Sequence, residues 1–240
     1  MLETDADTRT PGHGASPLPM QILLADDHPL FRDALRRVLS QILPQAQIHE
    51  TESVSGLLDL SSRVPDADLL LLDLNMPGAH GFSALAHMRA SHPTLPVIVV
   101  SAHEDPTLMR RALAHGAAGF VPKSADRAML DDAIRAVLDG ETWLPVGVAQ
   151  SPLALDPDEA TLAARIAELT PQQYRVLGMV CSGLLNKQIG YELGVSEATI
   201  KAHMTAILRK LGAHSRTQAA LLAARLTIDG TAPGIPADED

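Results

Sequence analysis

Three aspartates and one lysine end apolar segments of the chain, and together they could bind a cation and accept a phosphoryl group. Asp26 and Asp27 end the run MQILLADD, Asp73 ends ADLLLLD, and Lys123 follows AAGFVP. Short apolar runs of this kind are typical of strands buried on both faces of a parallel sheet. The C-terminal ends of such strands share one edge, where ligands bind. We therefore expect the four side chains to meet there.

The chemistry of this cluster follows from its charges. Mg²⁺ prefers carboxylate and carbonyl oxygens and keeps several waters. Neighbouring carboxylates repel one another, and a cation offsets the repulsion. Asp73 could then attack a phosphoryl group, giving an aspartyl phosphate, while Lys123 pairs with a phosphoryl oxygen. Each residue alone also has an ordinary interpretation: Asp27 as a helix cap, Asp73 as a loop acid before NMPG, and Lys123 as a surface lysine.

The segments that must position these residues alternate between strand and helix, which implies parallel βαβ units with right-handed crossovers. We expect an α/β fold with a doubly wound parallel sheet. The expected strands lie near residues 20–25, 46–50, 68–73, 96–101 and 118–121, and the helices near 29–42, 53–63, 82–91, 106–115 and 125–139. Ser101 ends the fourth strand, within reach of a phosphoryl oxygen, and Phe120 in the fifth could swing inward as Ser101 moves. Both are also ordinary core residues.

Composition narrows the class of protein. The chain has 240 residues, 46% of them hydrophobic, which suits one or two domains. Its one cysteine, Cys181, excludes an intrachain disulfide and suits a reducing compartment, so we expect a cytoplasmic protein. No apolar run approaches the roughly 20 residues of a membrane span, and the acidic N-terminus is unlike a secretory signal. We expect no membrane association.

Charge is distributed unevenly along the chain. The net charge is −10, yet residues 168–226 carry seven Lys and Arg against three Asp and Glu. Residues 1–167 carry 12 against 22. A basic segment joined to an acidic body suggests that the basic part binds nucleic acid.

The basic segment lacks a strand pattern and has the spacing of a helix-turn-helix. We expect helices at 171–182, 186–193, 197–211 and 215–226, after a linker that could hold a short helix near 158–168. Gly194 ends one helix and Ser196 begins the next, which leaves a turn of the right length. A short turn between helices also occurs in any helical bundle. The 197–211 helix has an apolar face opposite Ala202, Thr205 and Arg209.

Residues 20–140 resemble the receiver domain of two-component response regulators, which has a flavodoxin-like fold. The segments LLADDHPLFRDAL, LLLLDLNMPGAHGF, VIVVSAHED and GAAGFVPKSA carry the resemblance. It implies that a histidine kinase phosphorylates the domain. The implied roles are phospho-acceptor for Asp73, Mg²⁺ ligands for Asp26, Asp27, Asp73 and the backbone carbonyl of Asn75, phosphoryl contact for Lys123, and switch pair for Ser101 and Phe120.

Residues 169–220 resemble the DNA-binding domain of the LuxR type, and the whole chain resembles the NarL/FixJ subfamily. NKQI, VSEATIKAH and LRKLGAHSRTQA carry this resemblance in order. Gln173 stands where glutamate is usual, Thr205 where a basic or polar residue is frequent, and Gly190 should weaken its helix by about 1 kcal/mol. His203 could also be a packing residue. The implied DNA-contacting set is Lys187, Thr199, Lys201, Ala202, His203, Thr205, Arg209 and Lys210.

The expected organisation has five parts. These are an N-terminal tail (1–18), a receiver domain (19–140), a linker (141–167), a LuxR-type domain (168–227) and an acidic tail (228–240). An apolar stripe on the last helix could pair two copies on a palindromic DNA site, or only cover the domain's own core. The expected partners are double-stranded DNA, a cognate histidine kinase and a second copy of the chain.

The expected function is control of transcription by a regulator that is phosphorylated on Asp73 and is not an enzyme. Two alternatives remain open. In the first, the regulator does not depend on phosphorylation, and its receiver is a protein-interaction module. In the second, the acidic edge belongs to a phosphatase or phosphotransferase with an aspartyl nucleophile. That activity needs a second carboxylate as general acid, and Asn75 cannot supply it.

Overall fold

The computed structural model describes residues 19–79, 81–148 and 153–226. Its α/β part contains a parallel five-stranded sheet with the order β2-β1-β3-β4-β5. This order places β1 and β3 side by side, so their C-terminal ends bring Asp26 and Asp73 together. The strands are β1 (Gln21–Ala25), β2 (Gln47–Thr51), β3 (Leu69–Asp73), β4 (Val97–Ser101) and β5 (Gly119–Pro122).

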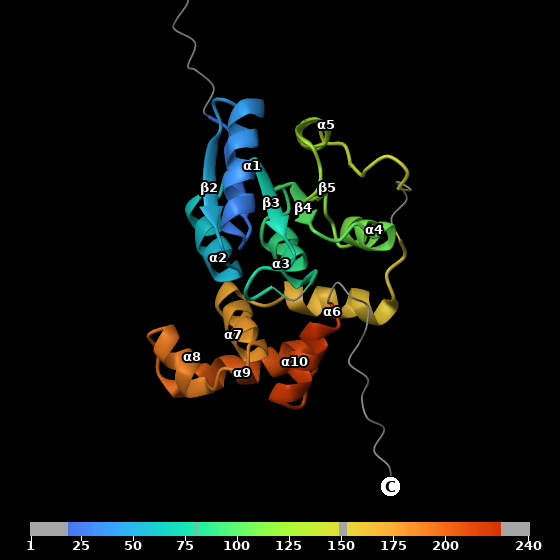
Figure 1. Ribbon diagram of the computed structural model, residues 1–240. Coiled ribbons are helices and arrows are strands. Elements are labelled where there is room, and N and C mark those ends of the chain that lie inside the picture. The colour runs from blue at the N-terminus through green and yellow to red at the C-terminus, as the bar shows by residue number, and fades with distance from the viewer. Residues whose placement is uncertain (1–18, 80, 149–152, 227–240) are drawn as a thin grey trace, which may run out of the picture.

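Helices cover both faces of the sheet, as predicted (Figure 1). Alternate strand residues face opposite sides: Leu69 and Leu71 pack with α1 and α5, whereas Leu70 and Leu72 pack with the other helices. Every residue of β3 is buried, which explains its unbroken apolar sequence. The helices of this part are α1 (Pro29–Ile42), α2 (Val54–Arg63), α3 (Ser83–Ser91), α4 (Pro106–Ala114) and α5 (Arg127–Leu138).

The second part of the described chain is helical, as the sequence predicts. Thr170 begins α7 with a capping box that includes Gln173, and the Ser196 side chain accepts a hydrogen bond from Thr199 N at the start of α9. The helix predicted near 158–168 is present as α6. The helices are α6 (Pro157–Ala167), α7 (Pro171–Cys181), α8 (Asn186–Glu192), α9 (Glu197–Leu211) and α10 (Arg216–Ala224).

The two parts share one hydrophobic core. The buried residues beneath α2, α3 and α4 are continuous with those of α6 to α10. Figure 1 shows α6 crossing between the sheet and the lower helices, and α3 packs along α6. The strands run toward the helical part, so the C-terminal edge of the sheet faces it. The packing thus places the acidic edge on the side of the α/β part from which the helical part extends.

Some predictions concern segments that the structure does not describe. The predicted tails, 1–18 and 228–240, lie outside the described residues. Among the residues described, no helix is both long enough and apolar enough to span a membrane.

Candidate phosphorylation site and nucleic-acid interface

The acidic edge is assembled by the ends of neighbouring strands. Asp26 directly follows β1 and Asp73 ends β3, and both side chains are almost completely buried. The Asp26 Oδ1 atom accepts a hydrogen bond from the backbone N of His28 at 2.8 Å, and Asp73 Oδ1 accepts one from Asn75 N at 3.0 Å. These bonds orient the two carboxylates while each keeps its second oxygen turned into the cluster.

Lys123 bridges these second oxygens. Its Nζ lies 2.7 Å from Asp26 Oδ2 and 2.8 Å from Asp73 Oδ2. Burial lowers the pKa of Lys123, but attraction to the two carboxylates outweighs burial, so the pKa lies above its ordinary value. The backbone N of Lys123 also donates to Ser101 O at 2.7 Å, which ties the lysine to the end of β4. The structure therefore brings together the predicted acids and the predicted lysine.

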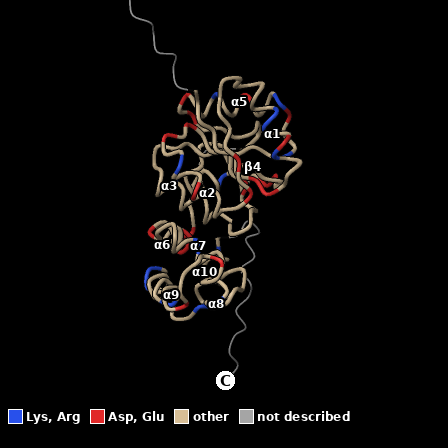
Figure 2. The backbone as a smooth tube through the Cα atoms, turned by 90° about the vertical axis from the view of Figure 1, so that its left-hand side faces the viewer, with Lys and Arg blue, Asp and Glu red and all other residues tan. Residues whose placement is uncertain are grey.

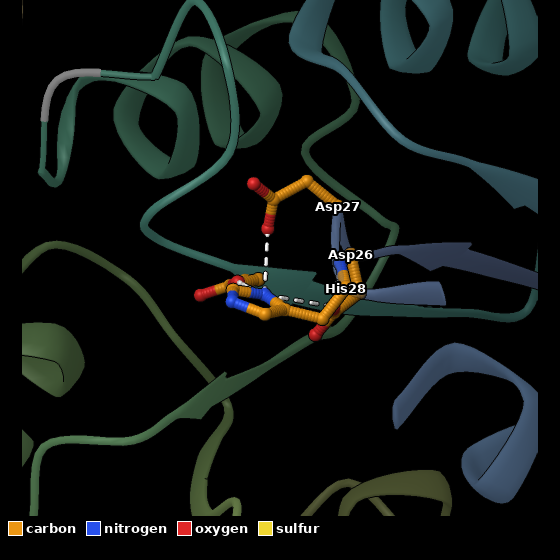
Figure 3. Close-up of side chains that lie close together, drawn as sticks. Asp26, Asp27 and His28 are labelled. Carbon is orange, nitrogen blue, oxygen red and sulfur yellow. Dashed lines mark hydrogen bonds and ion pairs between the residues drawn. The ribbon is translucent and has the colours of Figure 1, made fainter. Parts of the chain in front are cut away.

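Asp27 joins the same cluster with a partner that was not predicted. His28 Nδ1 lies 2.8 Å from Asp27 Oδ1, 3.6 Å from Asp26 Oδ1 and 3.9 Å from Asp73 Oδ2. Figure 3 shows the Asp27 carboxylate directed at the His28 ring. The alternative that Asp27 caps the helix is wrong, because the N-cap of α1 is His28, which makes no side-chain capping bond. The sequence signal for His28 was its position directly after the acidic pair.

The residues of the cluster fit a bound cation. Asp26 Oδ2 and Asp27 Oδ1 are buried, and no hydrogen bond of proper geometry reaches either atom. Their neighbours Lys123 and His28 make ion-pair contacts only. One ligand atom each from Asp26, Asp27, His28 and Asp73 can lie within 4.8 Å of the others. Buried carboxylate oxygens without donors are costly unless a positive charge satisfies them.

The remaining predicted residues of the α/β part are Asn75, Ser101 and Phe120. Asn75 follows Asp73 in the β3–α3 loop, with its backbone N bound to the Asp73 carboxylate. Ser101 and Phe120 are completely buried at 0% exposure. The Ser101 hydroxyl accepts a hydrogen bond from His103 N at 3.2 Å. The structure thus places Ser101 at the end of β4 and Phe120 in the core.

The helical part presents α9 on a face away from the sheet. Figure 2 shows basic residues along α9, on the lower part of the molecule. Lys201, Ala202, Thr205 and Arg209 are exposed, while Ile200, Met204, Ile207 and Leu211 are buried. Lys201 pairs with Glu197 one turn earlier, at 3.1 Å. The predicted division of α9 into an apolar face and an open basic face is therefore present.

Two residues of the helical part have contacts within the protein that the sequence did not predict. Gly190 was expected only to weaken α8, but a Cβ there would lie 2.8 Å from Val195 O, so the tight α8–α9 turn requires glycine. Lys210 was predicted to contact DNA, yet its Nζ donates to Glu168 O at 2.7 Å and to Gln173 Oε1 at 2.8 Å. Those bonds hold Lys210 against the start of α7.

The remaining predicted DNA residues differ in exposure. Lys187 at the start of α8 is exposed. His203 is half-buried, which fits its alternative as a packing residue. Thr199 is also half-buried, and its hydroxyl lies 2.9 Å from the Ser196 hydroxyl in the cap of α9.

Polar contacts link the two parts across their shared core. The Tyr174 hydroxyl lies 2.8 Å from Ser83 Oγ, and the Tyr174 ring stacks on His87 at 4.5 Å. On α6, Glu159 accepts from Arg111 at 2.7 Å and contacts His115 at 2.8 Å. The carbonyl of Gly78, in the loop after Asp73, is so close to α7 that a Cβ on Gly178 would lie 3.3 Å from it.

Comparison with known proteins follows the same division of the chain. The response regulator receiver domain family matches residues 22–135, and the family of bacterial regulatory proteins of the luxR type matches residues 167–223. The glycerol metabolism activator of Pseudomonas putida is 42% identical over 208 residues, which are 85% of this chain and 94% of that protein. The nitrate/nitrite response regulator protein NarL of Escherichia coli K12 is 32% identical over 206 residues, with the same coverage.

The chain belongs to the NarL/FixJ-type response regulators. This confirms the family, the α/β receiver fold and the LuxR-type helix-turn-helix predicted from the sequence. It also agrees with the expectation that the chain is not an enzyme, because these relatives are named as an activator and a response regulator.

A solved response regulator supports the same architecture. The structure of RcsB from Salmonella enterica serovar Typhimurium, bound to promoter P1flhDC with phosphomimetic BeF3−, has a TM-score of 0.51 and 25% identity. The match covers 87% of this chain and 99% of that one. The likeness therefore spans both the receiver and the DNA-binding domain.

Proposed function

We propose that the protein controls transcription by sequence-specific DNA binding that depends on phosphorylation of Asp73. The observation that carries this proposal is the buried Asp73 carboxylate, held by Lys123 and Asn75 beside two further acids at the edge of the sheet. The phosphoryl donor would be a cognate histidine kinase. The proposal includes a cytoplasmic location, which the single cysteine supports.

In the proposed reaction, an Asp73 oxygen attacks the donor phosphorus. The new oxygen–phosphorus bond forms as the phosphorus–nitrogen bond of the phosphohistidine breaks, and the leaving imidazole takes up a proton. Asp26, Asp27, Asp73 and the Asn75 carbonyl would hold Mg²⁺, which neutralises charge on the phosphoryl oxygens when bound. Lys123 would pair with one phosphoryl oxygen and Ser101 would donate to another, with Phe120 following Ser101 inward.

The proposed output runs through the loop after Asp73. That loop carries Gly78, whose carbonyl packs against Gly178 of α7. A phosphoryl group adds about −1.5 to −2 charges. By drawing Lys123 away from Asp26, it would move the loop that packs against α7. The domains would then separate, pair with a second copy through α10, or do both.

The DNA-binding part of the proposal rests on the open face of α9. Lys201, Ala202 and Thr205 would face the major groove, and Arg209 and Lys187 would contact phosphates. A duplex with a palindromic site would bind two copies. We propose domain boundaries of 19–140 for the receiver and 168–227 for the DNA-binding domain, joined by the linker 141–167.

One experiment tests the phosphorylation step. The full chain is incubated with acetyl phosphate and Mg²⁺ and its intact mass is measured. We expect a gain of one phosphoryl group that hydroxylamine removes, no gain in Asp73→Asn, and an unchanged gain in Asp132→Asn, an exposed acid on α5. Absence of any gain, with DNA binding intact, would favour the phosphorylation-independent regulator with a protein-interaction receiver.

A further inference from the structure

The receiver holds the helical part through α6, through α7 and just after the end of α10. On α6, Glu159 Oε1 lies 2.7 Å from Arg111 Nη2 and 2.8 Å from His115 Nε2, both on α4. After α10, the carbonyl of Leu226 accepts a hydrogen bond at 2.9 Å from Phe82 N, where the loop after Asp73 meets α3. Together with the packing of α7 described above, these contacts define the docked arrangement of the two parts.

The contact on α6 is charged and mostly buried. The side chains of Arg111, His115 and Glu159 are only 15%, 1% and 16% exposed. The His115 ring stacks on Phe82 at 4.6 Å, and the Arg111 guanidinium lies 5.1 Å from the centre of the same ring. Burial raises the pKa of Glu159, but its hydrogen bonds to His115 and Arg111 outweigh burial and hold that pKa below its ordinary value. Removal of either charged partner leaves the other without compensation, so this contact should hold α6 on the receiver.

The DNA-facing side of α9 is left open in the docked arrangement. Lys201, Ala202, Thr205 and Arg209 are exposed, and none of the contacts that define docking involves α9. The packing partners of α9 are α6, α7, α8 and α10, all within the helical part. Figure 2 shows its basic residues on the lower part of the molecule, with the receiver above. Docking therefore does not cover the side of α9 that would enter a major groove.

The end of α10 is held, by contrast. Ala223 and Leu226 are completely buried at 0% exposure. Arg225 Nη2 also lies 3.8 Å from Asp158 Oδ2 of α6. Figure 1 shows α10 beneath α6, with the receiver above both. The helix proposed to pair two copies thus has its end fixed by the receiver and by α6, although its N-terminal part is free of both.

We propose that docking restrains the pairing of two copies and leaves each single copy able to contact DNA. This inference rests on the proposed function and names the step that phosphorylation controls. The unphosphorylated chain contacts one half-site through α9. Binding of a pair to a palindromic site, with half-sites about one helical turn apart, requires the end of α10 to leave Phe82. Glu159 is the positioning residue that keeps α6, and with it α10, on the receiver.

Binding to two duplexes tests this inference with the full chain. A half-site is first defined by selection of bound duplexes from a random pool, and affinity is then measured for one half-site and for the palindrome. Glu159→Gln and Arg111→Ala break the charged contact from its two sides. Each should bind the palindrome at least about fivefold more tightly than the unchanged chain, and the single half-site within about twofold. Glu168→Gln makes the same charge change at an exposed position at the end of α6 and should alter neither affinity.

Two further measurements do not depend on the affinity of the variants. Acetyl phosphate with Mg²⁺ should give the unchanged chain the same gain on the palindrome and none on the half-site. Small-angle X-ray scattering should show a larger radius of gyration for Glu159→Gln and for Arg111→Ala, and no increase for Glu168→Gln.

The outcomes separate this inference from the proposed function. If phosphorylation or Glu159→Gln raises half-site affinity as much as palindrome affinity, docking does cover α9 and the inference is wrong. It is also wrong if the variants expand without a gain on the palindrome, or if they neither expand nor gain. If the chain gains a phosphoryl group but binds no duplex in either state, the proposed DNA-binding function itself fails.

Discussion

The acidic edge of the receiver and the open face of α9 carry the two proposed halves of the function, and they are built in opposite ways. Asp26 and Asp73 are buried at about 1% exposure, and their oxygens are oriented by backbone N–H groups. Lys201 is 66% exposed and pairs with the neighbouring Glu197 on the same helix. In the receiver cluster, the charged side chains already contact one another within the chain. On α9, the exposed basic side chains would make their main contacts only when DNA binds.

This difference has an energetic consequence. In a buried cluster, each charge depends on its neighbours, so removal of one leaves others without a partner. On an exposed helix face, charges are solvated before DNA binds, so removal of one changes binding and leaves folding nearly unaffected. Substitutions in the receiver cluster should therefore change stability, and substitutions on the open face of α9 should change DNA affinity.

The largest effect is expected at Lys123. Lys123→Met removes the ammonium that bridges Asp26 and Asp73, and it leaves buried carboxylates without a counter-charge. We expect the free energy of unfolding to fall by about 3 kcal/mol without added cation, measured by urea denaturation. Added Mg²⁺ should restore part of the loss. The exposed Lys187→Met serves as the control and should change it by less than about 0.5 kcal/mol.

The double variant Asp26→Asn with Lys123→Met measures the coupling between these charges. Removing one carboxylate along with the lysine should recover part of the lost stability, because less unpaired charge remains. If the two substitutions instead lower the free energy of unfolding additively, Asp26 and Lys123 do not interact. The proposed contrast between coupled charges in the receiver and independent charges on α9 would then be wrong.

A second effect is expected where the two domains meet. His87 is completely buried against Tyr174, and its pKa falls from 6.5 to about 4, chiefly because burial disfavours the charged ring, although the Ile166 carbonyl opposes this. The unfolded chain therefore binds this proton at a higher pH than the folded chain does. Stability from this group is complete above pH 6.5 and is lost progressively as the pH falls toward 4.

Acid titration checks this expectation. At pH 5 the loss from His87 should be about 2 kcal/mol relative to pH 7, measured from thermal or urea unfolding. His87→Leu should flatten the profile between pH 7 and pH 5, and His103→Leu, on an exposed residue, should leave its slope unchanged. An equally steep profile in His87→Leu would assign the acid sensitivity to other groups.

The same contrast explains which features could be predicted from the sequence. Asp26, Asp73 and Lys123 were predictable because each follows an apolar strand, and parallel strands end at one edge. The open face of α9 was predictable from helical periodicity. The contacts between the domains were not predictable. Ser83 and Tyr174, for example, are 91 residues apart in the sequence, and no local sequence pattern indicates that they meet. Helix propensity alone could not show why glycine stands at position 190, because the reason is the nearby Val195 carbonyl.

On α9, the expected effects appear in binding. Lys201→Ala should relax preference at one base position by about 1 to 3 kcal/mol, measured by selection of bound duplexes from a random pool. Arg209→Ala should weaken binding across all sequences and reduce the slope of affinity against salt by about one. Both variants should unfold within about 0.5 kcal/mol of the unchanged chain. A change of base preference in Arg209→Ala, or none in Lys201→Ala, would reverse these assignments.

The smallest effect is expected at Lys210, which belongs to the DNA-binding helix but is bonded within the protein. Its ammonium donates to Glu168 O and Gln173 Oε1 at the start of α7. Lys210→Ala should therefore lower the free energy of unfolding by about 1 kcal/mol and leave the salt slope of DNA binding unchanged. The neighbouring Arg209→Ala is the matched comparison. If Lys210→Ala is instead found to reduce the salt slope of DNA binding as much as Arg209→Ala does, Lys210 gives up its bonds to Glu168 and Gln173 and contacts DNA phosphates. In that case the exposure of a lysine in the free chain does not determine whether it binds DNA.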